Sequence, residues 1–417
     1  MQRAERFFQV LIISLLIILF SGRSQVDPGN ELERVRNYTR MIEFDYVTWT
    51  VDAVMGKTAQ GALGASRYIT SDSAKTVVLD YLKAVDRSQV LEWEIERIYS
   101  DPQITDPETE ASEKLEQLHQ VQAEKYQLGA LAESVLQAQV SEVIASSEIS
   151  FLGQPIPPLL YHVTELPLSL IVSPRGVIRQ DANISLLPEL DLNQVIRLED
   201  DVEKGLDVST MVTRIGGVGV YPTMVAQSTS LPWLMETVAH EWIHNYLTLQ
   251  PLGIRYDASA DLRTMNETTA SIAGKEIGTS LLELYYPEFL PPPSAPVPTV
   301  ETEPVEPIPP LFDFNSEMRI TRENADALLA EGKIEEAESY MEDRRKIFWE
   351  QGYQIRKLNQ AYFAFHGAYA DTPGGAAGED PVGAAVRELR AQSPNLAAFL
   401  KSMAGMRSFE DLQAALQ

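Results

Sequence analysis

Apolar residues recur at helical spacing through the first third of the chain. Between residues 72 and 99, and again between 107 and 147, they fall three and four residues apart, which is the spacing of one face of an α-helix. Asp72 stands where a helix cap is expected. We therefore predict that residues 26–150 form a helical N-terminal region, and we identify no catalytic chemistry in it.

The pattern changes near residue 151 to short, β-branched runs interrupted by glycine and proline. Two such runs, "PLSLIVSPRGVIR" and "STMVTRIGGVGVYPTMVAQ", are typical of strands and turns. Helical periodicity resumes in residues 230–248 and 263–286. We expect a mainly helical α+β fold, in which a small mixed or antiparallel sheet lies beside this helix pair, within a core of residues 151–290.

The last third of the chain begins with a segment rich in proline and glutamate. Residues 291–310 cannot form a packed core, so we predict an extended linker or surface loop there. Residues 311–417 return to helical periodicity and are predicted to form a helical C-terminal region.

The N-terminus has the pattern of an export signal. Arg3 and Arg6 precede an apolar run from Phe7 to Phe20, which fits a signal-peptide core better than a membrane span of about 20 residues. An uncleaved signal anchor is the close alternative. Either interpretation of residues 1–25 places the rest of the chain outside the cytoplasm, and we expect an exported, membrane-anchored protein.

Composition excludes several classes of function. The formal net charge of −26 disfavours nucleic acid as a partner, because phosphate binding needs clustered Lys and Arg. The chain has no cysteine, which excludes cysteine nucleophiles, iron–sulfur clusters and Cys-ligated zinc. Any zinc here must be held by histidine and carboxylate side chains.

Such a site is indicated by His240-Glu241-Trp242-Ile243-His244, an H-E-x-x-H motif. Residues four apart share a helix face, so His240 and His244 can both reach one ion. Glu241 is rotated by about 100°, where it can take a proton from water held by that ion. The chain has only five histidines, so this arrangement is rare by chance. The alternative is a pair of histidines that is solvated or packed in the core.

A catalytic zinc needs a third protein ligand. The second predicted helix contains Asn266-Glu267, with 22 residues between His244 and Glu267. This part of the chain, residues 234–278, resembles the gluzincin metallopeptidases, the thermolysin-like and aminopeptidase-like group. The resemblance implies that His240, His244 and Glu267 bind Zn²⁺, that Glu241 is the general base, and that the substrate is a peptide or protein. Asp257 and Asp261 in the connecting segment remain alternative ligands.

The helix face that carries Glu267 is made of small residues. Ala270, Ser271, Gly274 and Gly278 share this face and would allow close contact with the H-E-x-x-H helix. Thermolysin-like members have an aspartate at the position of Ser271, where it orients the first histidine. This departure leaves the subfamily open, because a ligand histidine normally has such a partner.

A peptidase also needs a surface for its substrate. In gluzincins an edge strand before the active-site helix pairs with the substrate backbone, and residues 216–227 occupy that place. Pro222 suits an edge strand, and the nearby glycines suit a bulge or a close backbone approach. A plain turn between two strands is the alternative.

The developing oxyanion needs a hydrogen-bond donor, which gluzincins take from a Tyr or His beyond the zinc helices. Tyr362, His366 and Tyr369 fall on one helix face and are our candidates, in which case the C-terminal region completes the cleft. Core packing is the competing interpretation of this face.

The predicted function is zinc-dependent peptide-bond hydrolysis. The alternative is a non-catalytic, membrane-tethered helical protein that binds a partner and retains a zincin-like fold or metal site.

Overall fold

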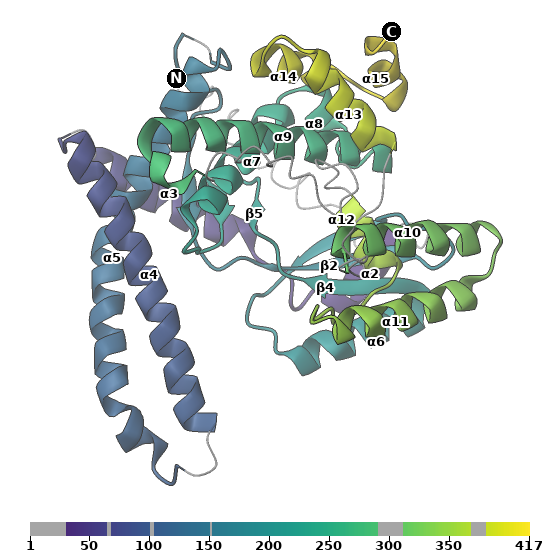
Figure 1. Ribbon diagram of the computed structural model, residues 1–417, viewed down its shortest axis with the longest axis horizontal. Helices are drawn as coiled ribbons and strands as arrows, with labels where there is room; N and C mark the ends of the chain where they lie inside the picture. Colours follow the sequence, from purple (N-terminus) through teal and green to yellow (C-terminus); the bar gives the residue numbers. More distant parts are fainter. Residues whose placement is uncertain (1–30, 65–67, 101–103, 151, 291–311, 368–380) are drawn as a thin grey trace, which may run out of the picture.

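The computed structural model describes residues 31–64, 68–100, 104–150, 152–290, 312–367 and 381–417 (Figure 1). The expected signal segment and the segment rich in proline and glutamate lie outside these residues. Of the described residues, 67% are helical and 8% are in strands, which confirms the mainly helical α+β fold. Among the described residues, no helix has the length and apolar character needed to cross a membrane.

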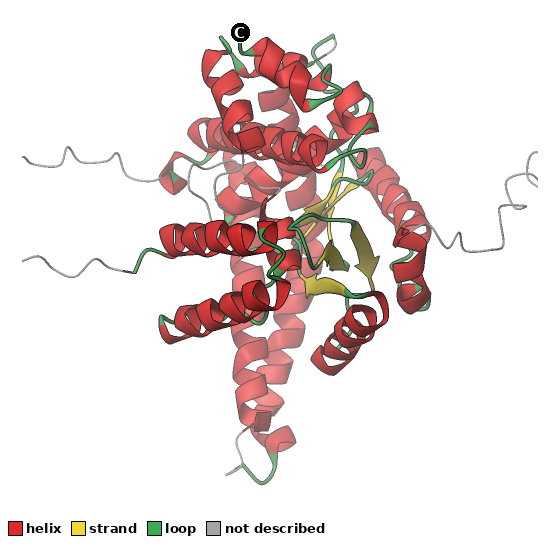
Figure 2. Ribbon diagram, turned by 90° about the vertical axis from the view of Figure 1, so that its right-hand side faces the viewer, coloured by secondary structure: helices red, strands yellow, loops and turns green. Residues whose placement is uncertain are grey.

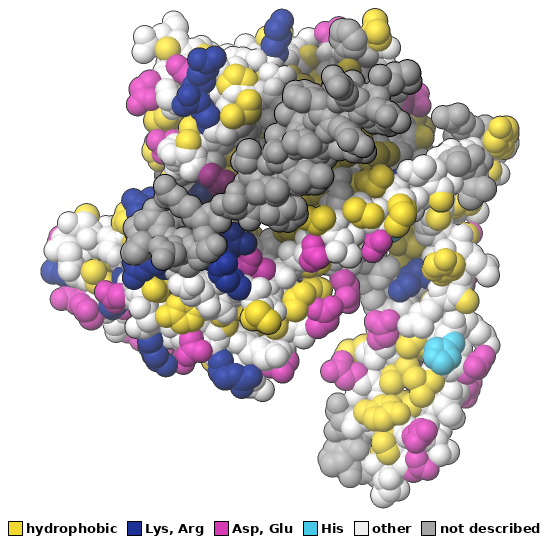
Figure 3. All heavy atoms as spheres, turned by 180° about the vertical axis from the view of Figure 1, so that it is seen from behind, with side chains coloured by type: hydrophobic (Ala, Val, Ile, Leu, Met, Phe, Trp, Pro, Cys, Tyr) yellow, Lys and Arg dark blue, Asp and Glu magenta, His cyan; other side chains and the backbone are white. Residues whose placement is uncertain are grey.

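The described residues of the N-terminal region form four helices: α2 (Glu31–Thr39), α3 (Tyr46–Leu63), α4 (Ser71–Ser100) and α5 (Pro107–Ser146). Helices α4 and α5 pack side by side as a long hairpin that projects from the body of the molecule (Figure 1). The projecting part carries hydrophobic side chains on its surface (Figure 3), and Trp93, Tyr99 and Tyr126 are all more than half exposed.

The hairpin joins the body through the C-terminal half of α5. Val135, Leu136 and Val140 are buried there in the largest hydrophobic core. Helix α3 is tied to the same half of α5 by a buried ion pair, in which Lys57 Nζ lies 2.6 Å from Glu133 Oε2. These contacts hold the C-terminal half of α3 in a fixed position relative to the body.

The strands form two three-stranded sheets, where the sequence predicted a single small one. One sheet is antiparallel, in the order β3-β2-β4. In the other, ordered β1-β6-β5, β1 runs parallel to β6 and β5 runs antiparallel to it. The strands are β1 (Tyr161–Val163), β2 (Leu168–Pro174), β3 (Ala182–Leu186), β4 (Val208–Thr213), β5 (Gly217–Val218) and β6 (Thr223–Val225).

The β3-β2-β4 sheet is covered by helices on both faces (Figure 2). Side chains alternate along β2, so Leu170 and Val172 face one core and Ile171 faces the other. The first core includes residues of α2 and α6, and the second includes residues of α10, α11 and α12. These later helices are α6 (Leu192–Leu206), α10 (Phe314–Ala330), α11 (Ile334–Glu350) and α12 (Gln360–Gly367).

The largest core surrounds the two helices that carry the H-E-x-x-H and Asn-Glu sequences. Helix α7 begins after Ser230, whose side chain accepts a hydrogen bond from the backbone of Trp233, and α9 begins after Ser259 in the same manner. The remaining helices pack around this pair (Figure 1). The central pair is α7 (Leu231–Thr248) and α9 (Ala260–Tyr285). The helices around it include α8 (Pro251–Ile254), η2 (Pro287–Phe289), α13 (Pro381–Gln392), α14 (Leu396–Ala404) and α15 (Phe409–Ala415).

Candidate metal centre and cleft

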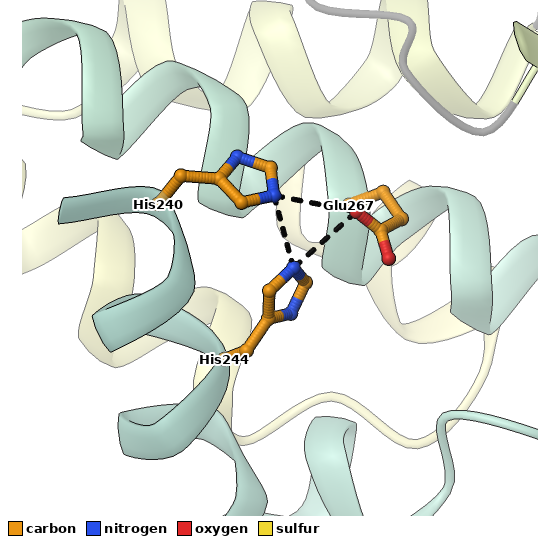
Figure 4. A group of neighbouring side chains, drawn as sticks. All are labelled: His240, His244 and Glu267. Atoms are coloured by element: carbon orange, nitrogen blue, oxygen red, sulfur yellow. Dashed lines mark hydrogen bonds and ion pairs between the residues drawn. The ribbon is translucent and has the colours of Figure 1, made fainter. Parts of the chain in front are cut away.

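His240, His244 and Glu267 converge at the contact between α7 and α9 (Figure 4). The two Nε2 atoms of the histidines are 3.0 Å apart. Glu267 Oε2 lies 3.5 Å from His240 Nε2 and 3.3 Å from His244 Nε2. The alternative ligands Asp257 and Asp261 are not part of this group: Asp261 is exposed, and the side chain of Asp257 is 86% exposed.

Each histidine has a partner for its other ring nitrogen. Asn266 Oδ1 lies 2.8 Å from His244 Nδ1, and Ser271 Oγ lies 3.5 Å from His240 Nδ1. A proton on Nδ1 that is donated to these oxygens leaves the Nε2 lone pair of each ring directed at the centre of the group. The contact of Ser271 with His240 is therefore the longer of the two, and that of Asn266 with His244 is the shorter.

The two oxygens of Glu267 have different surroundings. Tyr256 donates its hydroxyl proton to Oε1 at 2.5 Å. Oε2 is buried and makes no hydrogen bond. A buried carboxylate oxygen without a hydrogen bond, facing two imidazole nitrogens, is what a cation with nitrogen and oxygen ligands would satisfy. The residues present therefore fit Zn²⁺ by their chemistry and their placement.

The electrostatics of the group favour positive charge. Burial disfavours charge on His244, but Glu267 and Glu241 outweigh it and raise its pKa to about 9. Burial acts to raise the pKa of Glu267, yet the two histidines hold it well below its usual range. Burial also raises the pKa of Glu241, against the opposing effect of the histidines. Glu241 is thus the carboxylate of the group that most readily accepts a proton.

Glycines in front of α7 make room for the catalytic candidates. A Cβ atom on Gly217 would lie 2.4 Å from Glu241 Oε1, and one on Gly219 would lie 2.8 Å from His244 Cβ. Gly217 belongs to β5, which is an edge strand of its sheet. Of the two interpretations of these glycines, a close backbone approach is therefore the one that the structure supports.

Helices α7 and α9 also meet through glycine. A Cβ on Gly274 would lie 2.9 Å from the backbone oxygen of Glu236, and one on Gly278 would lie 3.2 Å from Glu236 Cα. The small-residue face that the sequence predicted thus brings Glu267 against the two histidines.

A cleft of about 540 Å³ opens at this group. Glu241, His244 and Glu267 line one wall, and β5 runs along it. Tyr46 and Ser185 line the cleft from α3 and β3, with the Tyr46 hydroxyl 2.7 Å from Ser185 Oγ. Burial raises the pKa of Tyr46, and the charge of Glu241 adds to the effect, so this hydroxyl keeps its proton near neutral pH.

Tyr46 and Tyr256 were not predicted from the sequence. Tyr46 belongs to the N-terminal region, in which we identified no catalytic chemistry. It is 195 positions before Glu241 in the sequence, and only the fold places both residues in the same cleft. Tyr256 follows the short helix α8, and nothing in its local sequence marks it as a partner of Glu267.

The aromatic residues of the C-terminal region that we expected in the cleft do not line it where the structure describes them. Tyr362 is buried in the core beneath the β3-β2-β4 sheet, and His366 packs on it with ring centroids 4.3 Å apart. Neither lines the cleft, although Phe365 of the same helix does. Burial lowers the pKa of His366 to about 4. Tyr369 lies outside the described residues.

Comparison of the chain with protein-family models, with curated proteins and with solved structures finds no match.

Proposed function

We propose that this protein is a zinc metallopeptidase, a hydrolase of peptide bonds. The observation that carries the proposal is the convergence of His240, His244 and Glu267 beside the buried Glu241 in the wall of a cleft. Two histidines and a glutamate are a known ligand set for catalytic zinc, and it leaves one position open.

Zn²⁺ in this group would polarise the scissile carbonyl and lower the pKa of water. Glu241 accepts a proton from the water as the water oxygen bonds to the carbonyl carbon. The same carboxyl then donates the proton to the leaving nitrogen as the carbon–nitrogen bond breaks, so the products are an amine and a carboxylic acid, which releases its remaining proton to solvent. Burial of Glu241 raises its pKa, which suits both transfers.

The cleft offers groups for the rest of the substrate. Strand β5 has a free edge beside Glu241, where an extended peptide can add as a further strand. Tyr46 faces the cleft with a protonated hydroxyl, and we propose it as the donor to the carbonyl oxygen as that atom gains charge. Tyr46 takes the function that the sequence assigned to Tyr362, His366 or Tyr369.

Export and membrane attachment through residues 1–25 are part of the proposal, because they rest on the N-terminal sequence pattern alone. The net charge of −26 supports a partner other than nucleic acid.

The test combines metal analysis with peptide cleavage by the purified chain. We expect about one zinc per chain, cleavage of a mixed peptide library, and loss of cleavage with retention of zinc in Glu241→Gln. Unchanged cleavage by that variant would contradict the mechanism. A zinc-loaded wild-type protein that cleaves nothing would favour the non-catalytic binding protein.

A second set of variants tests the ligands. Glu267→Ala should lose the metal, whereas Asp257→Ala and Asp261→Ala should keep it. Retention of zinc by Glu267→Ala would refute the assignment of the third ligand.

A further inference from the structure

Arg263 is a buried cation in the cleft wall. It lies four residues before Glu267 on α9 and therefore on the same helix face. It is only 9% exposed and lines the cleft. Among the described residues it is the only Arg or Lys that does so. Burying a charge costs free energy unless the charge is paired, so the partners of Arg263 decide what it does.

Those partners leave its charge poorly compensated. Nη1 donates to the backbone oxygen of Gln180 at 3.0 Å, and Nη2 reaches Asp257 Oδ1 at 3.4 Å. The Asp257 side chain is 86% exposed. The Nε atom is buried without any hydrogen-bond partner. The guanidinium carbon lies 5.7 Å from the centre of the Tyr256 ring, whose hydroxyl binds Glu267.

Arg356 is an example of a structural arginine in this protein, one whose charge is paired with a buried carboxylate. Its Nη1 and Nη2 atoms bind both oxygens of Glu199 at 2.7 and 2.6 Å, and Glu199 is only 2% exposed. Such a two-point pair with a buried carboxylate is the strong form of this interaction. Among the described residues Arg263 has no such pair, and its Nε and Nη2 N–H groups have the geometry to donate to both oxygens of a ligand carboxylate.

We propose that Arg263 binds a carboxylate of the peptide substrate. This inference rests on the proposed peptidase function and adds a substrate class to it, namely peptides with a carboxylate near the scissile bond. The carboxylate takes the place of Asp257 at Nη2 and offers its second oxygen to Nε. Two sources share this chemistry, the C-terminus of the peptide and an acidic side chain, and the experiment separates them.

The probes are four acetylated alanine tetrapeptides. The first has a free C-terminal carboxylate and the second is its C-terminal amide. The third and fourth are amides in which one alanine is replaced by glutamate or by glutamine. We expect the wild-type protein to prefer a carboxylate probe over its neutral match in kcat/KM by roughly 10- to 100-fold. A preference confined to the first pair indicates a C-terminal subsite, and one confined to the second pair indicates a side-chain subsite.

The variants test whether Arg263 causes the preference. Arg263→Gln should reduce the ratio between matched probes to near one, and Arg263→Lys should restore only part of it, because lysine lacks the two-point fork. Arg345→Gln is the matched control, since Arg345 pairs with Glu342 on α11 and neither residue lines the cleft. It should leave the ratio unchanged. Thermal melts of all variants establish that they are folded.

The failures of the two proposals are distinguishable. Equal cleavage of matched probes by the wild type, or an unchanged ratio in Arg263→Gln, overturns the carboxylate subsite and leaves the peptidase standing. Cleavage of no peptide at all overturns the peptidase. In that case calorimetry of the same four probes with zinc-loaded protein decides the subsite, because equal affinity for matched probes refutes it and a carboxylate preference that Arg263→Gln removes supports it.

Discussion

Asn266 and Ser271 contact the rings of His244 and His240 at unequal distances. Asn266 Oδ1 is 2.8 Å from His244 Nδ1 and is nearly fully buried, whereas Ser271 Oγ is 3.5 Å from His240 Nδ1. A partner of this kind fixes the tautomer and the direction of the ligand lone pair. The difference in length implies that the two histidines depend on their partners to different extents.

We therefore predict that Asn266→Ala weakens zinc binding by roughly 10- to 100-fold, and that Ser271→Ala weakens it less. Competition with a chelating dye gives both affinities. Equal losses for the two variants would contradict the ranking, and no loss for Asn266→Ala would show that His244 is held by other contacts.

Tyr46 supports a second prediction at the residue scale. Tyr46→Phe removes the proposed donor to the carbonyl oxygen, so kcat should fall roughly 100-fold while KM changes little. Ser185→Ala is the control, because it removes the partner of the Tyr46 hydroxyl and leaves the hydroxyl itself. If Phe at position 46 raises KM and spares kcat, Tyr46 binds substrate without stabilising the transition state.

Helix geometry explains which residues of the candidate site could be predicted from the sequence. The positions of His240, His244 and Glu241 relative to one another are set within one helix and can be predicted from spacing. The positions of Tyr46 and Arg263 around Glu241 and Glu267 depend on contacts between distant segments, for which no local pattern exists.

Among the elements, α7 and α9 form the contact on which the metal group depends. Gly274 sits where a Cβ would meet the backbone of Glu236 and the Cβ of His240 at about 3 Å. Gly56, in the exposed part of α3, has open space at the same position. Both glycines lie within helices, but only Gly274 is in close contact with a neighbouring helix.

Gly274→Ala should accordingly lower the free energy of unfolding by about 1–3 kcal/mol through overpacking and weaken zinc binding through His240. Gly56→Ala should raise the free energy of unfolding by up to about 1 kcal/mol, because alanine favours the helix. Urea denaturation measures both. A stabilising Gly274→Ala would mean that α7 and α9 can separate without cost.

Helix α12 gives the protein a pH-dependent stability. The folded state holds the pKa of His366 at about 4, below its usual value of 6.5. Between these values the unfolded chain binds a proton that the folded chain does not, so stability falls as the pH falls from 6.5 to 4. The full loss is about 3 kcal/mol.

The variant His366→Phe keeps an aromatic ring against Tyr362 but cannot bind the proton, so the loss of stability that His366 causes at low pH should disappear. Urea midpoints of the wild type and the variant at pH 7 and pH 5 measure it as a difference, since other groups titrate equally in both. Parallel pH dependence in the two proteins would show that His366 is readily protonated in the fold.

The same helix shows what periodicity can and cannot predict. The spacing of Tyr362 and His366 correctly places them on one helix face, but it does not say which neighbour that face meets. The sheet packs on Tyr362, and Phe365 turns to the cleft. Strand pairing is likewise non-local, so the β-branched runs predicted strands without indicating that they divide into two sheets.

For the molecule as a whole, the metal group links two helices of the largest core, so a bound ion stabilises the folded state. Free zinc at 100 times its dissociation constant should add about 2.7 kcal/mol to the free energy of unfolding. Melting curves with zinc and with a chelator measure the shift. Glu267→Ala should show a much smaller one, and an equal shift would place the stabilising ion elsewhere.

The residues that line the cleft extend from Leu32 in α2 to Phe365 in α12, whereas the metal group spans only residues 240–267. During synthesis, a chain released as far as α9 holds all three ligands and Glu241 but lacks α10, α11 and α12, which support the sheet behind the far wall. Such a chain lacks part of the support of the cleft, so on the proposed function metal binding and peptide cleavage depend on different lengths of the sequence.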